Sequence, residues 1–103
     1  MQAANGFFET SDGRLKTIKS NIDTNSAIDF IKAANVVNFN WKSDTSEEPK
    51  NNIGLIAQDV EQYYPEFVST NEDGYKSVDY AKLCTVLIPV LKDLITRVEK
   101  LEK

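Results

Sequence analysis

The chain is 103 residues long, carries a formal net charge of -4, and contains no histidine and a single cysteine. This length supports one domain with a modest core, and a hydrophobic content of 41% is too high for a disordered chain. The acidic balance argues against a duplex-binding module. The lack of histidine excludes Ser-His-Asp catalysis and histidine-ligated metal sites. One cysteine is too few for an intrachain disulfide.

Membrane and targeting signals are also missing from the sequence. The longest apolar run, residues 86–91, includes a proline and is far too short to span a bilayer. Residues 1–10 have neither the basic start nor the apolar stretch of a signal peptide. We therefore expect a soluble domain without cofactor or metal, which binds neither nucleic acid nor membrane. Its chemistry would use serine, lysine or carboxylate side chains.

The first half of the chain predicts an extended arm, a helix and a strand. Residues 1–10 are expected to be extended, as the end of a preceding segment or as an arm that packs on a partner. Asp12-Gly13 indicates a turn that tolerates positive φ. A helix capped by Asn25 or Ser26 follows, and alternation over residues 36–42 then predicts a strand.

The second half predicts an α+β domain. After a polar loop at 43–52, a short strand at 53–57 leads into a helix at 58–64. Two strands, 67–69 and 75–78, flank a hairpin-type connection. From Asp79, a predicted N-cap, the chain is expected to stay helical to its end. The fold class is therefore a small antiparallel sheet with short helices and a long C-terminal helix.

That terminal helix carries apolar residues at alternating steps of three and four, the a and d positions of a coiled coil. They are Cys84, Leu87, Leu91, Leu94, Val98 and Leu101. Ile88, Val90 and Ile95 widen the stripe. Either three or more helices associate through it, or the helix docks on its own globular body. Pro89 would cost about 3 kcal/mol inside a helix, but it lies away from the a/d stripe.

Without histidine, a serine nucleophile needs a lysine as its base. Ser11 and Lys16 are five residues apart, so they diverge in a helix and face opposite ways in a strand. Only the intervening turn would bring them together. A lysine acts as a base only when neutral, which requires burial or a nearby cation; Arg14 or an oligomer interface could supply this. A turn serine beside a solvated lysine is the alternative.

Four segments of the sequence, taken in order, are specific enough to indicate a family. They are S-D-G-R-L-K at 11–16, A-I-D-F-I-K to V-N-F-N-W-K at 27–42, I-G-L-I-A-Q-D-V-E-Q-Y-Y-P-E-F-V at 53–68, and Y-K-S-V-D-Y-A-K-L at 75–83. In this order they resemble the peptidase S74 family, the intramolecular chaperone auto-processing domain of phage tail fibres, tailspikes and endosialidases. The resemblance spans roughly residues 11–103.

The resemblance implies a C-terminal chaperone that forms a homotrimer through a parallel coiled coil at 79–103. It would assist the folding of a passenger fibre or spike, of which residues 1–10 are the end. Ser11 would be the nucleophile, Lys16 the general base and Thr10–Ser11 the scissile bond of a self-cleaving, single-turnover serine endopeptidase. The family works in the host bacterial cytoplasm during virion assembly, and the passenger becomes part of the virion. A structural trimerisation module that does not cleave is the alternative.

Overall fold

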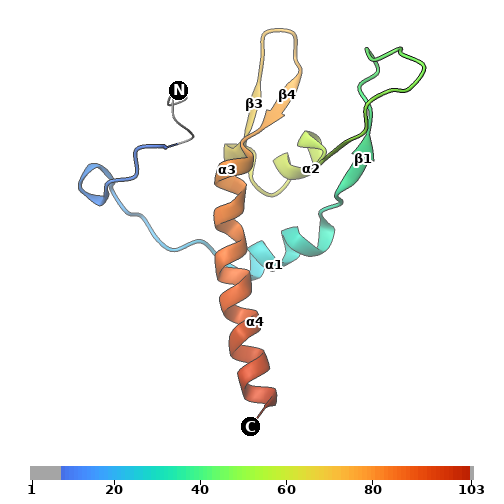
Figure 1. Ribbon diagram of the computed structural model, residues 1–103. Coiled ribbons are helices and arrows are strands. Elements are labelled where there is room, and N and C mark those ends of the chain that lie inside the picture. Colours follow the sequence, from blue (N-terminus) through green and yellow to red (C-terminus); the bar gives the residue numbers. More distant parts are fainter. Residues whose placement is uncertain (1–7, 103) are drawn as a thin grey trace.

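The computed structural model describes residues 8–102 (Figure 1). It shows a long helical run at residues 80–101, which we call the stalk, with smaller elements gathered around its upper end. The helices are α1 (Thr24–Ala33), α2 (Ala57–Glu61), α3 (Tyr80–Leu83) and α4 (Leu87–Leu101). The strands are β1 (Val37–Phe39), β2 (Asn52–Gly54), β3 (Val68–Thr70) and β4 (Lys76–Val78). Short 3-10 turns occupy Gly13–Leu15, Pro65–Phe67 and Cys84–Val86. The α+β class is confirmed.

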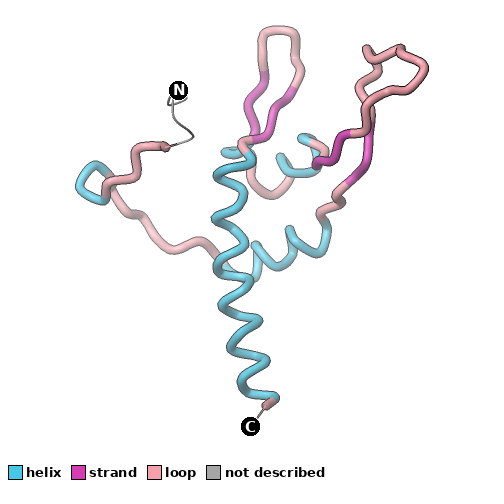
Figure 2. Tube along the Cα trace, in the orientation of Figure 1, coloured by secondary structure: helices cyan, strands magenta, loops and turns pink. Residues whose placement is uncertain are grey.

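The strands form two separate antiparallel pairs instead of one small sheet (Figure 2). β1 pairs with β2 so that Asn38 lies opposite Ile53. β3 pairs with β4 so that Ser69 lies opposite Ser77. The chain turns between β3 and β4 through Gly74, whose φ of 86° favours glycine. Each strand is three residues long, so the expected strands at 36–42 and 53–57 were too long.

A small core joins the elements of the head, our name for residues 24–86. Its buried members are Ala27 and Phe30 of α1, Val60 of α2, and Val86 at the top of the stalk. Tyr64 packs edge-on against Phe30, with ring centres 5.4 Å apart. α1 begins two or three residues earlier than expected, because Asp23 is its cap and accepts a hydrogen bond from the Ser26 N–H at 3.1 Å. The core therefore holds α1, α2 and the stalk together.

The terminal helix is interrupted where the sequence predicted continuity. The 3-10 turn at Cys84–Val86 separates α3 from α4. Pro89 then falls in the first turn of α4, where backbone N–H groups have no partner within the helix. The expected helix-interior cost of Pro89 therefore does not arise. Asp79 caps α3 as predicted, accepting a hydrogen bond from the Lys82 N–H.

The head packs on a different face of α4 from the predicted a/d stripe. Val86 is buried, and Pro89, Val90 and Asp93 are partly buried on the side that meets the head. The described residues of the a/d stripe, which we call the seam, remain largely exposed in the single chain. Leu87 is 44%, Leu91 53%, Leu94 53%, Val98 43% and Leu101 85% exposed. Docking on the chain's own body therefore does not cover the seam.

Residues 8–22 form an arm that leaves the stalk beside the start of α1 and loops outward (Figure 1). Every residue of this arm is exposed. Among residues 8–102, the structure contains no helix with the length and apolarity needed to cross a membrane. Residues 1–7 of the segment predicted to end a passenger lie outside the described residues.

Candidate active site

The Ser11–Lys16 segment folds into a tight 3-10 turn. Asp12 caps this turn, and its carboxylate accepts a hydrogen bond from the Arg14 N–H at 2.9 Å. The backbone N–H of Leu15 donates to the Asp12 carbonyl at 3.0 Å, and that of Lys16 donates to the Gly13 carbonyl at 3.2 Å. The turn expected at Asp12-Gly13 is present, and it does not use the tolerance of Gly13 for positive φ, because within the described residues positive φ occurs only at Gly74. The turn is made by the Asp12 cap.

This turn brings the two candidate side chains into contact. Lys16 Nζ donates a hydrogen bond to Ser11 Oγ over 2.6 Å. A nucleophile and its base need a contact of about 2.6–3.2 Å for proton transfer. The five-residue spacing thus meets the geometric requirement of a Ser-Lys pair. Both residues are exposed in the single chain.

Arg14 does not serve as a free cation for this pair. Its guanidinium contacts the Asp12 carboxylate through Nη2–Oδ2 at 2.8 Å and Nε–Oδ1 at 3.2 Å. The Arg14 side chain, and then its backbone N–H, hold the pKa of Asp12 below its ordinary value, while Asp12 raises the pKa of Arg14. The Arg14 charge is therefore balanced within the turn. Two features were expected to favour a neutral Lys16, the Arg14 cation and an oligomer interface. Of these, the oligomer interface remains.

A pocket of about 520 Å³ separates the turn from the top of the stalk. Thr10, Ser11 and Lys16 line one side of it, and Lys82 and Thr85 line the other. Lys82 lies 3.9 Å from the Asp79 carboxylate, and the Thr85 hydroxyl donates to the Lys82 carbonyl at 2.7 Å. The sequence did not predict Lys82 or Thr85 at this pocket, because they lie about seventy residues from Ser11 along the chain.

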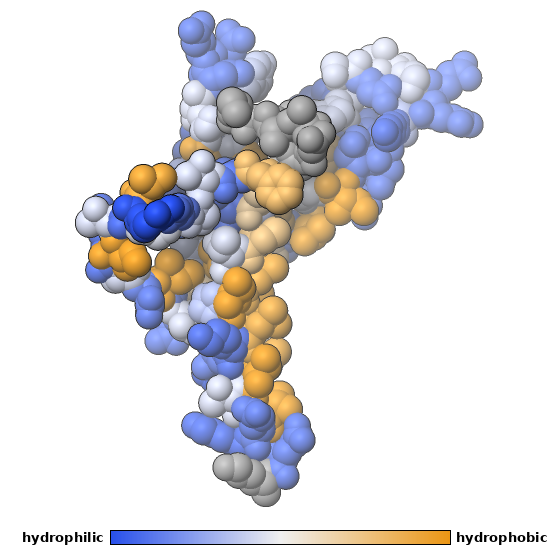
Figure 3. Space-filling view, turned by 60° about the vertical axis from the view of Figure 1, so that its left-hand side comes forward, coloured by the Kyte–Doolittle hydropathy of each residue, from blue (hydrophilic) through white to orange (hydrophobic). Residues whose placement is uncertain are grey.

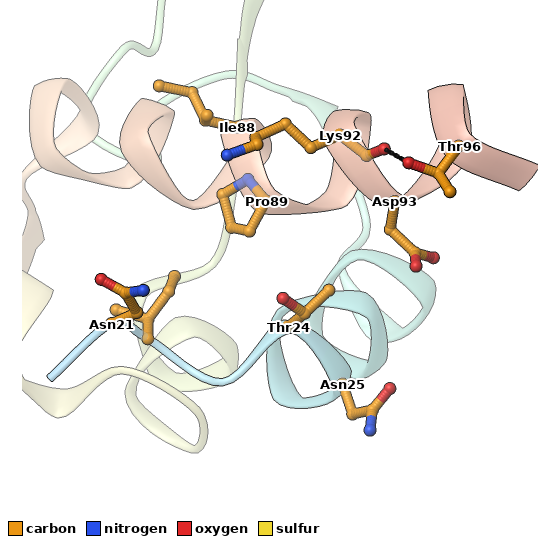
Figure 4. A pocket seen from close by; sticks show the side chains of 9 residues that line it. Asn21, Thr24, Asn25, Ile88, Pro89, Lys92, Asp93 and Thr96 are labelled. Atoms are coloured by element: carbon orange, nitrogen blue, oxygen red, sulfur yellow. Dashed lines mark hydrogen bonds between the residues drawn. The ribbon is translucent and has the colours of Figure 1, made fainter.

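A second pocket, of about 550 Å³, lies between the end of the arm, the start of α1 and α4 (Figure 4). Thr24, Asp93 and Thr96 contribute polar groups, and the Thr96 hydroxyl donates to the Lys92 carbonyl at 3.1 Å. Its lining includes the threonine hydroxyls and Lys92, but the Thr96 hydroxyl bonds the Lys92 carbonyl and not its amine, so no nucleophile is paired with a base as Ser11 is with Lys16. The turn at Ser11 is therefore the better candidate for covalent chemistry.

The seam residues predicted for assembly lie on one exposed face, and Figure 3 shows apolar residues running in a band along the stalk. Cys84, the first of them, is exposed and free. Arg97, next to the seam, pairs with Asp93 of its own helix at 2.8 Å. The structure thus leaves an apolar stripe unpaired in one copy.

Comparison with known proteins identifies the family. Residues 11–69 match the model of the family Peptidase_S74, described as chaperone of endosialidase. Because the match covers more than half of the chain, the chain belongs to this family, and the resemblance noted in the sequence is confirmed. The match begins at Ser11, and the stalk lies outside the matched residues. No curated protein matched the chain.

Proposed function

We propose that this member of the Peptidase_S74 family is a C-terminal intramolecular chaperone that releases itself by cutting Thr10–Ser11. The observation that carries the proposal is the 2.6 Å contact between Lys16 Nζ and Ser11 Oγ. The matched residues begin at Ser11, on the downstream side of the proposed cut. Thr10, on the upstream side, lines the same pocket as the pair.

The chemistry starts with a neutral Lys16 amine, which takes the proton of the Ser11 hydroxyl. Ser11 Oγ then attacks the carbonyl carbon of Thr10. The Thr10–Ser11 C–N bond breaks, and the Ser11 nitrogen leaves as an amine after receiving the proton from Lys16. Water hydrolyses the resulting ester, which frees the Thr10 carboxylate and restores the Ser11 hydroxyl. Each bond that forms is matched by one that breaks.

The negative charge on the Thr10 oxygen needs hydrogen-bond donors during this attack. The N–H groups of Arg14, Leu15 and Lys16 already donate within the turn. The N–H groups of Asp12 and Gly13 are therefore the nearest backbone candidates for this role.

The chaperone role follows from assembly into a parallel homotrimer along the seam. A passenger of three chains must begin folding in register, and this costs association entropy. A trimeric domain at the end of the chains loses this association entropy once, when it assembles. It then raises the local concentration of the passenger strands. Release afterwards would leave the passenger kinetically trapped, because the folding aid is no longer attached.

Assembly would also control the time of cleavage. The turn and Lys16 are open to water in the single chain. Packing of a second copy over the turn would exclude water and favour the neutral amine. On this proposal, cleavage waits for the trimer. Folding and release would occur in the bacterial cytoplasm during virion assembly, and the passenger would remain in a phage tail fibre or spike.

Mass spectrometry tests the cleavage directly, on the chain alone and on the chain fused behind a trimeric fibre passenger. The expected product begins at Ser11 and is absent from Ser11→Ala and Lys16→Arg. Ser20→Ala and Lys19→Arg are matched controls in the same exposed arm, and they should cleave as the unchanged chain does. Cleavage that persists in Ser11→Ala, or in a monomeric Leu91→Asp/Leu94→Asp variant, would contradict the proposal or its timing.

A trimerisation module that does not cleave is the second candidate function. The exposed seam favours it independently of the Ser-Lys pair, because assembly along α4 needs no chemistry. An intact fusion that sediments as a trimer would support this alternative.

A further inference from the structure

The sequence contains two Asp-Gly pairs, Asp12–Gly13 in the candidate site and Asp73–Gly74 between β3 and β4. In such a pair the glycine nitrogen can attack the carboxyl carbon of the aspartate side chain, because glycine has no side chain to hinder the approach. A C–N bond forms, the amide proton and the carboxyl hydroxyl leave as water, and a five-membered succinimide results. Water then opens the ring at either carbonyl, which restores aspartate or gives isoaspartate.

Isoaspartate at position 12 would disrupt the turn that holds the candidate site. In isoaspartate the main chain runs through the former side chain, so the backbone between Ser11 and Lys16 becomes one methylene longer. The carboxylate that remains is attached directly to Cα, and it cannot reproduce the cap that Asp12 makes with the Arg14 N–H at 2.9 Å. The contact of 2.6 Å between Lys16 Nζ and Ser11 Oγ therefore requires an intact aspartate in this turn.

The attacking group of this pair is free in the structure. Asp12 and Gly13 are both exposed to water. Within residues 8–102 no hydrogen bond occupies the Gly13 N–H. No atom lies within 4 Å of the position that a Cβ atom would take at Gly13, so the surroundings do not crowd this nitrogen. Any restraint on the reaction must therefore come from the Asp12 carboxylate.

Arg14 holds both oxygens of that carboxylate. Its guanidinium contacts Oδ2 through Nη2 at 2.8 Å and through Nε at 3.2 Å, and Nε also lies 3.2 Å from Oδ1. The Asp12 side chain must break these contacts before its carboxyl carbon can turn toward the Gly13 nitrogen. The protonated acid reacts more readily than the carboxylate, because hydroxide is a better leaving group than oxide, and the Arg14 side chain lowers the pKa of Asp12. Both effects slow ring closure.

The second pair, Asp73–Gly74, is held in the opposite way. Its glycine N–H donates to the Asn71 carbonyl at 3.0 Å, and the Asp73 N–H donates to Asn71 Oδ1 at 2.9 Å. Among residues 8–102, no hydrogen bond or ion pair holds the Asp73 carboxylate. An arginine thus holds the carboxylate at Asp12 only, and Asp73 is a reference site within the same chain.

We propose that Asp12–Gly13 is a site of succinimide and isoaspartate formation, and that the Arg14 guanidinium suppresses this reaction by holding both carboxylate oxygens. Arg14 thereby keeps the turn covalently intact, although its charge is balanced and does not act on Lys16. The inference goes beyond the proposed self-cleavage and does not depend on it, because ring closure at Asp12 uses neither Ser11 nor Lys16.

The test follows isoaspartate at both pairs during incubation of the full chain at neutral pH. Digestion after lysine places Asp12 and Asp73 on separate peptides, which end at Lys16 and Lys76. Mass spectrometry with electron-transfer fragmentation then distinguishes isoaspartate from aspartate. Arg14→Gln removes the guanidinium and keeps the backbone N–H that caps the turn. Isoaspartate at position 12 should form several-fold faster in this variant, a modest factor because exposed ion pairs are weak, while the rate at Asp73 should not change.

Two further variants show whether the effect is local. Arg97→Gln removes a pair of the same kind, with Asp93 of α4, and should leave the rate at position 12 unchanged. Gly13→Ala, added to Arg14→Gln, should make the reaction slow again, because a methyl group hinders the attacking nitrogen. The turn accommodates this alanine, since Gly13 has open space at its Cβ position and no positive φ.

Three results would overturn the proposal. The first is an equal rate at position 12 in Arg14→Gln and in the unchanged chain. The second is an increase of the same size at Asp73, which would mean that the substitution loosens the whole chain. The third comes from incubation in urea, where the folded contacts are lost and the two chains should react alike. A difference as large in urea as in the folded state would place the effect in the local sequence and not in the contacts of Arg14.

Discussion

At the scale of single residues, the candidate site is organised by the pairing of its charges. The Asp12 carboxylate makes two contacts with Arg14: it accepts a hydrogen bond from the Arg14 N–H, which caps the turn, and it binds the Arg14 guanidinium. Lys16 is left in contact with Ser11 and not with a carboxylate. A carboxylate beside Lys16 would favour its charged form and oppose its use as a base. The Asp12 carboxylate is therefore paired with Arg14 within the turn, while the carboxylate of Glu9 lines the same pocket as Ser11 and Lys16.

Two tyrosines of the head should respond in opposite ways to loss of their hydroxyl groups. The Tyr64 hydroxyl is buried and has no hydrogen-bond partner among residues 8–102, and burial raises the pKa of this phenol. The Tyr80 hydroxyl accepts from the Leu55 N–H. An unpaired buried hydroxyl costs about 1–3 kcal/mol, whereas a made hydrogen bond contributes about 1 kcal/mol. Tyr64→Phe should therefore be neutral or stabilising, and Tyr80→Phe should destabilise by about 1 kcal/mol.

Urea unfolding of both variants under the same conditions, followed by circular dichroism, measures this difference. Because each change removes one oxygen and keeps the ring, the variants serve as controls for each other. A loss of stability in Tyr64→Phe as large as that in Tyr80→Phe would mean that the Tyr64 hydroxyl is paired in the folded protein.

At the scale of elements, the stalk presents two faces with different roles, and two valines distinguish them. Val86 is 1% exposed and packs in the core of the head, whereas Val98 belongs to the seam and is 43% exposed. Val86→Ala should destabilise each chain by about 2 kcal/mol, within the range for truncating buried aliphatic residues. Val98→Ala should leave a monomeric chain nearly unchanged and weaken the assembly.

The comparison is made in the Leu91→Asp/Leu94→Asp background, with thermal unfolding as the measurement. There Val86→Ala is expected to lower the Tm and Val98→Ala is not. Equal losses for the two substitutions in that background would show that the seam packs on its own head, contrary to the structure.

The elements also show which parts of the fold could be predicted from the sequence. The hairpin of β3 and β4 and the stalk followed from Gly74, from the alternation around it and from the apolar repeat, all of which are local signals. The cap at Asp23 was missed, although its bond to the Ser26 N–H is also a local signal. The break at Cys84–Val86 was missed as well. Ser11 and Lys16 could be paired from a local turn. Lys82 could not be placed beside them, because only the folded chain brings α3 to that pocket.

At the scale of the whole molecule, a single copy of the chain has a small hydrophobic core. Its described core has four buried residues, Ala27, Phe30, Val60 and Val86. A fully buried apolar side chain contributes about 1.5–3 kcal/mol, and the ordering of each residue costs a comparable amount. In the proposed trimer, contacts between copies would supply much of the stability, and that stability would depend on concentration.

The Tm of the chain should therefore rise with protein concentration. An assembly of three copies is favoured over unfolded monomers as concentration increases, so each tenfold increase should raise the Tm by several degrees. Scanning calorimetry over a hundredfold range of concentration measures the slope. Leu91→Asp/Leu94→Asp should have a lower Tm with no slope, while Lys92→Asp, at an exposed position outside the seam, should keep the slope. A Tm independent of concentration in the unchanged chain, with sedimentation as a monomer, would mean that one copy is stable alone and that the exposed seam is not an interface between copies.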